Sequence, residues 1–316
     1  MFLFPYLVRP ERKSFGWLLG RAYKRKIAYD AVRIAASKMN VEVNDLSHEP
    51  TELYNRISVK KEWKKHFKIL KPLKYETKKQ ANHLRFVCIS DTHNKTDEMQ
   101  LPEGDILLHA GDFTQVGAPS EVEHFISFLD RVRPSFQQIV VIAGNHDLTF
   151  DTDNYSSIDV AAMFHKGKTF DLKAIKSSLQ QKCTYLEDNG TEIAGIKVYG
   201  TPWQPEFGGW GFNLRRGPDC LEKWRKIPDD IEILITHEPP LGHGDKCQSG
   251  ARAGCAELLS TIQSRVKPKY HIFGHIHEGY GITTDGVTTY INASSVNLGY
   301  RQVNDPIIFD MPIKSM

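Results

Sequence analysis

Residues 85–93, RFVCISDTH, give the clearest indication of the fold of this 316-residue chain. This stretch opens with an apolar run of β-favouring residues and ends in two polar side chains, Asp91 and His93. The run predicts a buried strand over residues 85–90, with the polar pair on the loop that follows. Because Asp91 and His93 are two residues apart, both can face one metal ion where the strand gives way to the loop.

The same combination of an apolar run and a polar ending recurs along the chain. The endings are Gly111-Asp112, Gly144-Asn145-His146-Asp147, a lone His237, and Gly274-His275-Ile276-His277. Strands are predicted over residues 85–90, 106–109, 139–143, 197–199, 232–236 and 270–273, with a final pair at 287–291 and 307–310. Helices are predicted between them, for example over 120–132 and 254–265. This alternation predicts an α/β architecture, whose sites gather at the carboxyl ends of the strands.

The polar endings supply the ligands that a two-metal hydrolytic site requires. Asp112 is the natural bridge, because a carboxylate can join two cations and the preceding glycine lets the backbone turn sharply. With two divalent cations, two aspartates and a bridging hydroxide, the site keeps a net charge of about +1, which attracts a phosphate ester and stabilises its transition state. The two predicted ligand sets are Asp91, His93, Asp112 and His277 for one metal, and Asp112, Asn145, His237 and His275 for the other.

The mixed nitrogen and oxygen ligands also bear on the metal and on the chemistry. They suit Mn²⁺, Fe or Zn²⁺ better than Ca²⁺, and Mg²⁺ rarely takes this much imidazole. We expect Mn²⁺, with Fe, Zn²⁺ or Mg²⁺ as alternatives. His146 adjoins a ligand and is predicted to be the catalytic residue that gives a proton to the leaving group. Asp147 is either its orienting partner or a structural cap.

Taken together, the motifs resemble the calcineurin-like metallophosphoesterase superfamily, whose pattern is D-x-H, G-D, G-N-H-[D/E], H and G-H-x-H. The resemblance runs from residue 85 to about residue 310, and every motif position is filled. TPWQP (201–205), HEPPLG (237–242) and HIHEGYG (275–281) are similar to its metallophosphoesterase-domain-containing branch. The resemblance implies two stacked mixed β-sheets flanked by helices, and hydrolysis of phosphodiesters, with nucleotide-like or cyclic nucleotide substrates.

The sequence argues against protein phosphatase activity and leaves two alternatives to a phosphodiesterase. The protein phosphatases of the superfamily carry G-D-x-x-D-R-G, whereas residues 111–117 here lack the second Asp and the Arg. The alternatives are a phosphomonoesterase and a non-catalytic regulatory protein that binds metal and nucleotide. Residues 203–210 form either an aromatic lid that stacks on a base or a surface loop anchored by its tryptophans. Arg215, Arg216 and Arg252 are either phosphate contacts or ordinary surface residues.

The charge is divided unevenly along the chain. Residues 1–80 hold 19 Lys and Arg against 8 Asp and Glu, and residues 81–316 hold 22 against 30. We expect residues 1–80 to be a basic, helical N-terminal extension and linker, and residues 81–316 to be the metallophosphoesterase domain. The extension either makes weak contact with an anionic membrane or nucleic acid, or is a solvated helical face packed on the main domain.

The cysteines and the apolar runs indicate the compartment. Five scattered cysteines without a CxxC pair favour a reducing environment, and no apolar run approaches membrane-spanning length. We therefore expect a cytoplasmic protein without a transmembrane segment. Residues 9–29 are rich in Arg and Lys with Glu11 as the sole acid, which makes mitochondrial import the alternative.

Overall fold

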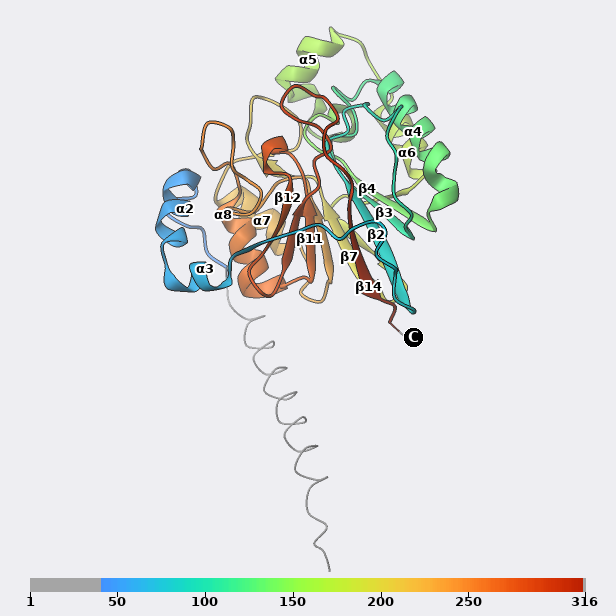
Figure 1. The fold of residues 1–316 in the computed structure, drawn as a ribbon. Coiled ribbons are helices and arrows are strands. Elements are labelled where there is room, and N and C mark those ends of the chain that lie inside the picture. The colour runs from blue at the N-terminus through green and yellow to red at the C-terminus, as the bar shows by residue number, and fades with distance from the viewer. Residues whose placement is uncertain (1–40, 315–316) are drawn as a thin grey trace, which may run out of the picture. The chain divides into compact units, whose positions relative to one another are not determined.

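The computed structural model describes residues 41–314. Two β-sheets stack face to face in it, with helices on their outer faces (Figure 1). In the five-stranded sheet, β2 to β5 run parallel and β14 pairs antiparallel with β2. Its strands, in spatial order, are β14 (Ile307–Pro312), β2 (His83–Ile89), β3 (Ile106–Ala110), β4 (Gln138–Ile142) and β5 (Thr184–Tyr185).

The seven-stranded sheet is also mixed. Its centre, β13, β11, β10 and β7, is parallel, and the strands at both edges are antiparallel. In spatial order the strands are β1 (Lys68–Leu70), β12 (Gly281–Thr284), β13 (Thr289–Asn292), β11 (Tyr270–Phe273), β10 (Ile233–Thr236), β7 (Ile196–Thr201) and β6 (Asn189–Ile193). A separate two-stranded ladder joins β8 (Gln204–Pro205) and β9 (Asn213–Leu214).

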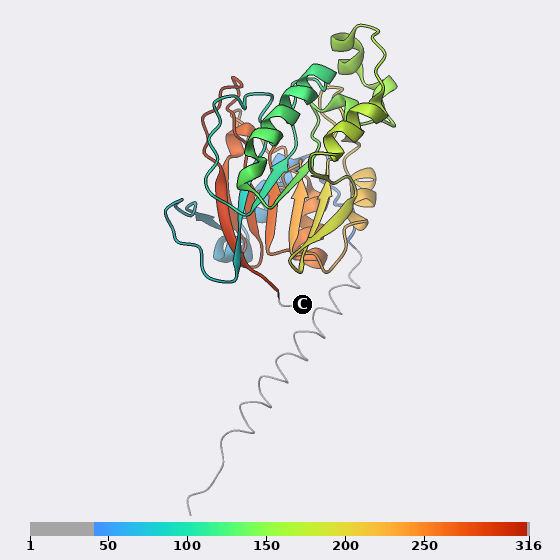
Figure 2. The ribbon, with the colours of Figure 1, turned by 90° about the vertical axis from the view of Figure 1, so that its right-hand side faces the viewer.

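Alternation along the strands explains the layers. In β2, Phe86 and Cys88 face the other sheet, whereas Val87 and Ile89 face the helices. Strands that are buried on both faces read as continuous apolar runs, as observed here. Two helices, α4 (Pro119–Val132) and α6 (Leu172–Gln180), cover the five-stranded sheet (Figure 2). The seven-stranded sheet is covered by α7 (Pro218–Arg225) and α8 (Ala256–Thr261), which continues as a π-helical turn, η4 (Ile262–Val266).

Helix α4 shows how local sequence sets an element. Pro119 occupies its first turn, where a missing N–H costs nothing. Glu121 accepts hydrogen bonds from the backbone N–H groups of Val116 and Ala118, both at 3.0 Å, and so caps the helix start. Its buried residues, Val122, Phe125, Phe128 and Leu129, recur at helical spacing and pack on the sheet.

The predicted α/β class with two stacked mixed sheets is confirmed, and each predicted strand from residue 85 onward has a counterpart. The two strands predicted at the end of the chain lie in different sheets, β13 in one and β14 in the other. Short strands such as β1 and β5 were not predicted. Their two or three residues carry no readable alternation, and β1 is exposed throughout.

Residues 41–80, the described part of the predicted extension, pack against the rest of the described chain. They form α2 (Pro50–Ser58), α3 (Lys61–His66) and β1, which pairs with β12 at the sheet edge. Leu53 is buried against Leu241 and Leu259, and Trp63 lies 5.4 Å from His243, ring centre to ring centre. Residues 1–40 of the predicted helical extension lie outside the described residues. Within residues 41–314, no helix combines the length and apolarity needed to cross a membrane.

Candidate metal centre

The five motifs meet because they follow strands that end at the same side of the molecule. Asp91 and His93 follow β2, Asp112 follows β3, and the GNHD motif follows β4. Backbone hydrogen bonds join the first loops, from Asp91 N to Gly111 O at 2.9 Å and from His93 N to Asp112 O at 3.0 Å. On the other sheet, Gly274 N donates to His237 O at 3.2 Å. The loops therefore form one connected surface above both sheets.

Several candidate ligands have an uncommon backbone conformation. The φ angles are +51° for Asp91, +42° for His93, +56° for Asp112 and +67° for His275. Non-glycine residues enter this left-handed region at a cost of about 1–3 kcal/mol each, and such strain clusters at functional sites. The surrounding hydrogen bonds hold these turns, which bring side chains from successive loops into one space.

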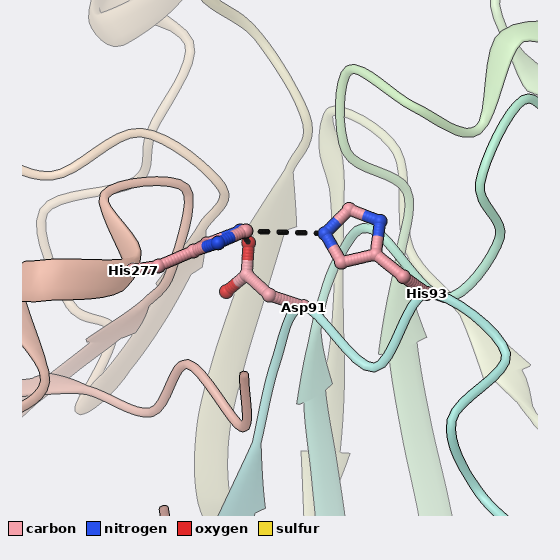
Figure 3. Close-up of side chains that lie close together, drawn as sticks. All are labelled: Asp91, His93 and His277. Carbon is pink, nitrogen blue, oxygen red and sulfur yellow. Dashed lines mark hydrogen bonds and ion pairs between the residues drawn. The ribbon is translucent and has the colours of Figure 1, made fainter. Parts of the chain in front are cut away.

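One group of ligand atoms is formed by Asp91, His93 and His277, from the loops after β2 and β11 (Figure 3). His277 Nε2 lies 3.3 Å from His93 Nε2 and 3.5 Å from Asp91 Oδ1, and His93 Nε2 lies 3.8 Å from Asp112 Oδ2. Asp91 Oδ2 is buried without a hydrogen-bond partner in the described chain. A buried carboxylate oxygen without a partner is costly, and a cation at this position would satisfy it.

A second group surrounds the other side of Asp112. His237 Nε2 lies 3.2 Å from Asp112 Oδ2 and 3.0 Å from Asn145 Oδ1, and His275 Nδ1 lies 2.9 Å from the same amide oxygen. Asp91, Asp112 and His237 also offer ligand atoms that all lie within 4.8 Å of one another. Asp112 is therefore adjacent to both groups, and all seven predicted ligands are brought together.

Backbone carbonyls orient three of the imidazoles. In each ring Nδ1 donates to a carbonyl oxygen, which leaves Nε2 free to act as a ligand. The pairs are His93 with Thr114 O at 3.1 Å, His237 with Ala110 O at 2.9 Å, and His277 with Asn297 O at 3.2 Å. Sequence reasoning missed these partners, because a backbone carbonyl has no residue type by which to recognise it.

Burial and nearby carboxylates set the protonation of the histidines. Burial lowers the pKa of His93 and of His275 to about 3, so both imidazoles are neutral, the form that binds a metal. Burial also acts to lower the pKa of His237, but the charge of Asp112 outweighs it and raises that pKa to about 10. Asp91 likewise raises the pKa of His277 against the effect of burial. In the metal-free protein, His237, a ring that a metal would occupy, therefore carries an additional proton.

Two motif glycines allow the loops to approach the carboxylates. A Cβ added at Gly274 would lie 2.0 Å from Asp91 Oδ2, and one at Gly144 would lie 2.4 Å from Asp112 Oδ1. Any side chain at either position would collide with a candidate ligand. Glycine is therefore required at these two positions by the space available.

Asp147 joins two of the loops. Its carboxylate accepts from the backbone N–H groups of Gly144 at 2.8 Å, Asp112 at 2.9 Å and Thr114 at 2.9 Å. It also accepts from the Thr114 hydroxyl at 2.6 Å, and it makes no bond to the His146 ring. Of the two roles considered for Asp147, the structural one matches these contacts.

His146 faces the candidate metal centre but belongs to neither of the two predicted ligand sets. Its Nδ1 donates to Gln115 O at 2.6 Å, and its Nε2 lies 4.0 Å from Asp112 Oδ2. Its backbone N–H donates to Asp112 Oδ1 at 2.7 Å. The Trp210 ring stacks on it, with ring centres 3.8 Å apart and planes at 28°.

A cavity of about 280 Å³ opens beside the centre. Asp112, Asn145, His146, His275 and His277 form one wall, and the rings of Phe207 and Tyr300 line it with Arg216, Glu206, Glu238 and Glu278. Arg216 is the only one of the three candidate arginines in this lining, and its guanidinium donates to the carbonyl oxygens of Ala253 and Gly254. Arg215 pairs with Asp219 on the surface, and Arg252 pairs with Asp245 at 2.6 Å.

The aromatic segment 203–210 divides into anchors and one exposed ring. Trp203 donates to Asp188 at 3.0 Å, and Lys223 Nζ lies 3.5 Å above its ring. Phe207 is 58% exposed and lies edge-on to His275, with ring centres 6.0 Å apart. Within this segment, Phe207 is therefore the ring available for contact with a bound molecule.

Comparisons with known proteins agree with this geometry. The calcineurin-like phosphoesterase family matches residues 84–279. The chain is 43% identical over 301 residues to human metallophosphoesterase domain-containing protein 1, covering 93% of this chain and 92% of that protein. It is 42% identical over 301 residues to the Mus musculus protein of the same name, with the same coverage. It is also 42% identical over 287 residues to UPF0046 protein T07D4.2 of Caenorhabditis elegans, covering 86% of this chain and 70% of that protein.

The chain belongs to the calcineurin-like phosphoesterase family. Family and ligand clusters together indicate a phosphoesterase hydrolase that works with two divalent metal ions.

Proposed function

We propose that the protein is a binuclear metallophosphodiesterase acting on nucleotide-like or cyclic nucleotide diesters. The observation that carries the proposal is the position of Asp112 between two groups of ligand atoms, with the unpartnered Asp91 Oδ2 facing the same space. The proposed ligand sets are those predicted above, with Asp112 shared. Mn²⁺ is the proposed metal, because imidazole, amide and carboxylate ligands are mixed.

In this proposal the metal ligands, His146 and two aromatic rings have different roles in the reaction. When bound, two divalent ions lower the pKa of a water molecule and neutralise charge on the phosphoryl oxygens. His146 donates its Nδ1 proton to Gln115 O, so the proton for the leaving group would be a second one, carried at Nε2 of the imidazolium form. As water adds to phosphorus and the P–O bond to the leaving group breaks, this proton passes to the departing oxygen. Phe207 and Tyr300 give an apolar surface to the organic group.

The charge of the cavity supports a diester over a monoester. Glu206 and Glu278 line the same cavity as the ligand side chains, whereas burial raises the pKa of the third acid there, Glu238, well above its usual value and favours its neutral form. Acidic groups disfavour a dianionic monoester more than a monoanionic diester, since the repulsion scales with the charge of the substrate.

Hydrolysis of bis-p-nitrophenyl phosphate after chelator treatment tests the proposal, with and without added Mn²⁺. Turnover that returns only with metal, together with about two bound ions per chain, supports it. Faster turnover of p-nitrophenyl phosphate than of the diester favours the phosphomonoesterase alternative. Folded protein that binds two ions and nucleotide without hydrolysing any diester favours the non-catalytic regulatory alternative.

The basic extension and the free cysteines support proposals about the binding partners and the compartment of the protein. We propose that exposed lysines of α3, such as Lys61, Lys64 and Lys65, give weak contact with an anionic membrane or nucleic acid. Substituting these three by Glu tests the contact better than deletion, since α2 and β1 are packed into the domain. All five cysteines are free, which supports a reducing compartment such as the cytoplasm.

A further inference from the structure

We propose that Trp210 is the positioning residue for the proton donor His146, a role that rests on the proposed function. The two rings are nearly parallel and their centres are 3.8 Å apart, within the range of stacked aromatic pairs. The sequence suggested that this tryptophan either stacks on a substrate base or anchors the loop. Its face is instead occupied by the catalytic side chain, so its contribution to the reaction passes through His146.

His146 needs such a support more than its neighbours do. The rings of His93, His237 and His277 are each fixed by a hydrogen bond at Nδ1, and the proposed metals fix them again at Nε2. The ring of His146 has one short hydrogen bond, from Nδ1 to Gln115 O, and its Nε2 must stay free for the leaving group. One hydrogen bond allows the ring to tilt about the Nδ1–O line. The Trp210 face removes that freedom, and the edge-on contact with His93, at 4.6 Å, limits the opposite tilt.

Trp210 is itself held firmly. It packs against a small cluster formed by Leu148, Ile158, Val160 and Ala161, between the GNHD loop and α5 (Asp159–His165). Its backbone N–H donates to Phe207 O at 3.2 Å, closing a turn in which Gly208 and Gly209 have φ angles of +57° and +68°. The next residue, Gly211, donates to Asn145 O at 3.1 Å. The indole is thus fixed to the same loop that carries His146.

This arrangement predicts a loss that depends on the leaving group. Hydrolysis joins a water oxygen to phosphorus and breaks the P–O bond to the alcohol. The alcohol oxygen takes the proton from His146 Nε2, and the proton that the water loses replaces it through solvent. Phenolate is a poorer leaving group than p-nitrophenolate and depends more on that proton. A tilted His146 should therefore slow the hydrolysis of diphenyl phosphate more than that of bis-p-nitrophenyl phosphate.

The experiment compares Trp210→Leu and Trp210→Phe with the unchanged full chain, using Mn²⁺-loaded protein and both substrates. Trp210→Leu is expected to lower kcat for diphenyl phosphate about tenfold more than for bis-p-nitrophenyl phosphate, with KM and metal content near those of the unchanged protein. Trp210→Phe, which keeps a stacking ring, should restore most of the difference. In the His146→Ala background, Trp210→Leu should have no further effect on the ratio of the two rates.

Leu53→Ala is the control for a loss of core packing, since Leu53 is buried in a separate cluster with Leu241 and Leu259. It should lower thermal stability and leave the ratio of rates unchanged. Equal losses on both substrates for Trp210→Leu, or an additive effect with His146→Ala, would overturn the positioning role. If His146→Ala itself slows both substrates equally, its proton-donor role fails and the inference fails with it. Absence of metal-dependent turnover in the unchanged protein would instead refute the proposed function.

Discussion

Replacing Gly274 by Ala should remove a metal while leaving the fold in place. The added methyl would lie 2.0 Å from Asp91 Oδ2 and 2.2 Å from Ser90 Oγ, whereas ordinary contact begins at 3.4 Å. The carboxylate must therefore retreat by about 1.4 Å, if the backbone does not move. Metal–ligand distances tolerate deviations of about 0.2 Å, and a misplacement of about 1 Å can cost about 100-fold in rate. We expect turnover of bis-p-nitrophenyl phosphate to fall at least about 100-fold.

Metal content by mass spectrometry and turnover, measured on the same preparation, check this expectation. The metal proposed to bind Asp91 should be lost first, leaving about one ion per chain. Gly167→Ala is the control: it introduces the strain of a residue at φ +73°, but its added methyl has nothing within 4 Å. If Gly274→Ala keeps two ions and full turnover in folded protein, Asp91 does not hold the metal in the proposed way.

Three further predictions concern the bridge, metal loading and acid stability. Asp112→Asn should lower metal-dependent turnover about 100-fold or more, since a neutral amide replaces the shared carboxylate; near-normal turnover of the folded variant would contradict the shared-ligand assignment. Metal loading at pH 7.5 should release protons, because the metal-free His237 has its pKa raised to about 10, so affinity should increase with pH. Calorimetry in buffers of different ionisation enthalpy measures that release, and its absence would contradict the assigned protonation. Burial lowers the pKa of His243 to about 3 in the folded protein, whereas in the unfolded chain the same imidazole has a pKa near 6.5. As the pH falls, the unfolded chain is therefore protonated at this histidine before the folded protein is. Stability should be fully present above pH 6.5 and fall by up to about 1.4 kcal/mol per pH unit below it, a part of the pH dependence that His243→Phe should remove in urea unfolding.

The sequence was sufficient to predict the strands that carry the site, because their signals are local. An apolar run that ends in a polar residue can be read within about ten residues. This is why residues 85–90 and 139–143 were predicted as strands, and why Asp91 and Asn145 were recognised as candidate ligands. The short edge strand β1 could not be found in this way, since its three exposed residues show no period.

The distances between the candidate ligands depend on the tertiary structure. His93 and His277 are separated by 184 positions and Asn145 and His237 by 92, yet each pair comes within 3.3 Å. The pattern of the motifs suggested these partners through resemblance to a family, but the distances follow from the stacking of the two sheets. The number of residues between two positions does not determine their distance in a folded protein. The geometry of each ligand group therefore depends on packing.

The supports of the centre were decided entirely by the fold. The carbonyl of Gln115 orients His146 and that of Asn297 orients His277, and every residue type offers the same carbonyl. From the sequence, Trp210 was either part of a lid that stacks on a base or an anchor of a surface loop, and in the fold it packs on the cluster with Ile158 and stacks on His146. The order of residues was enough to identify the side chains that could carry the chemistry, because ligand type and strand period are properties of neighbouring residues. The tertiary structure alone decided how those side chains are oriented, because orientation comes from backbone groups and packed rings that are distant along the chain.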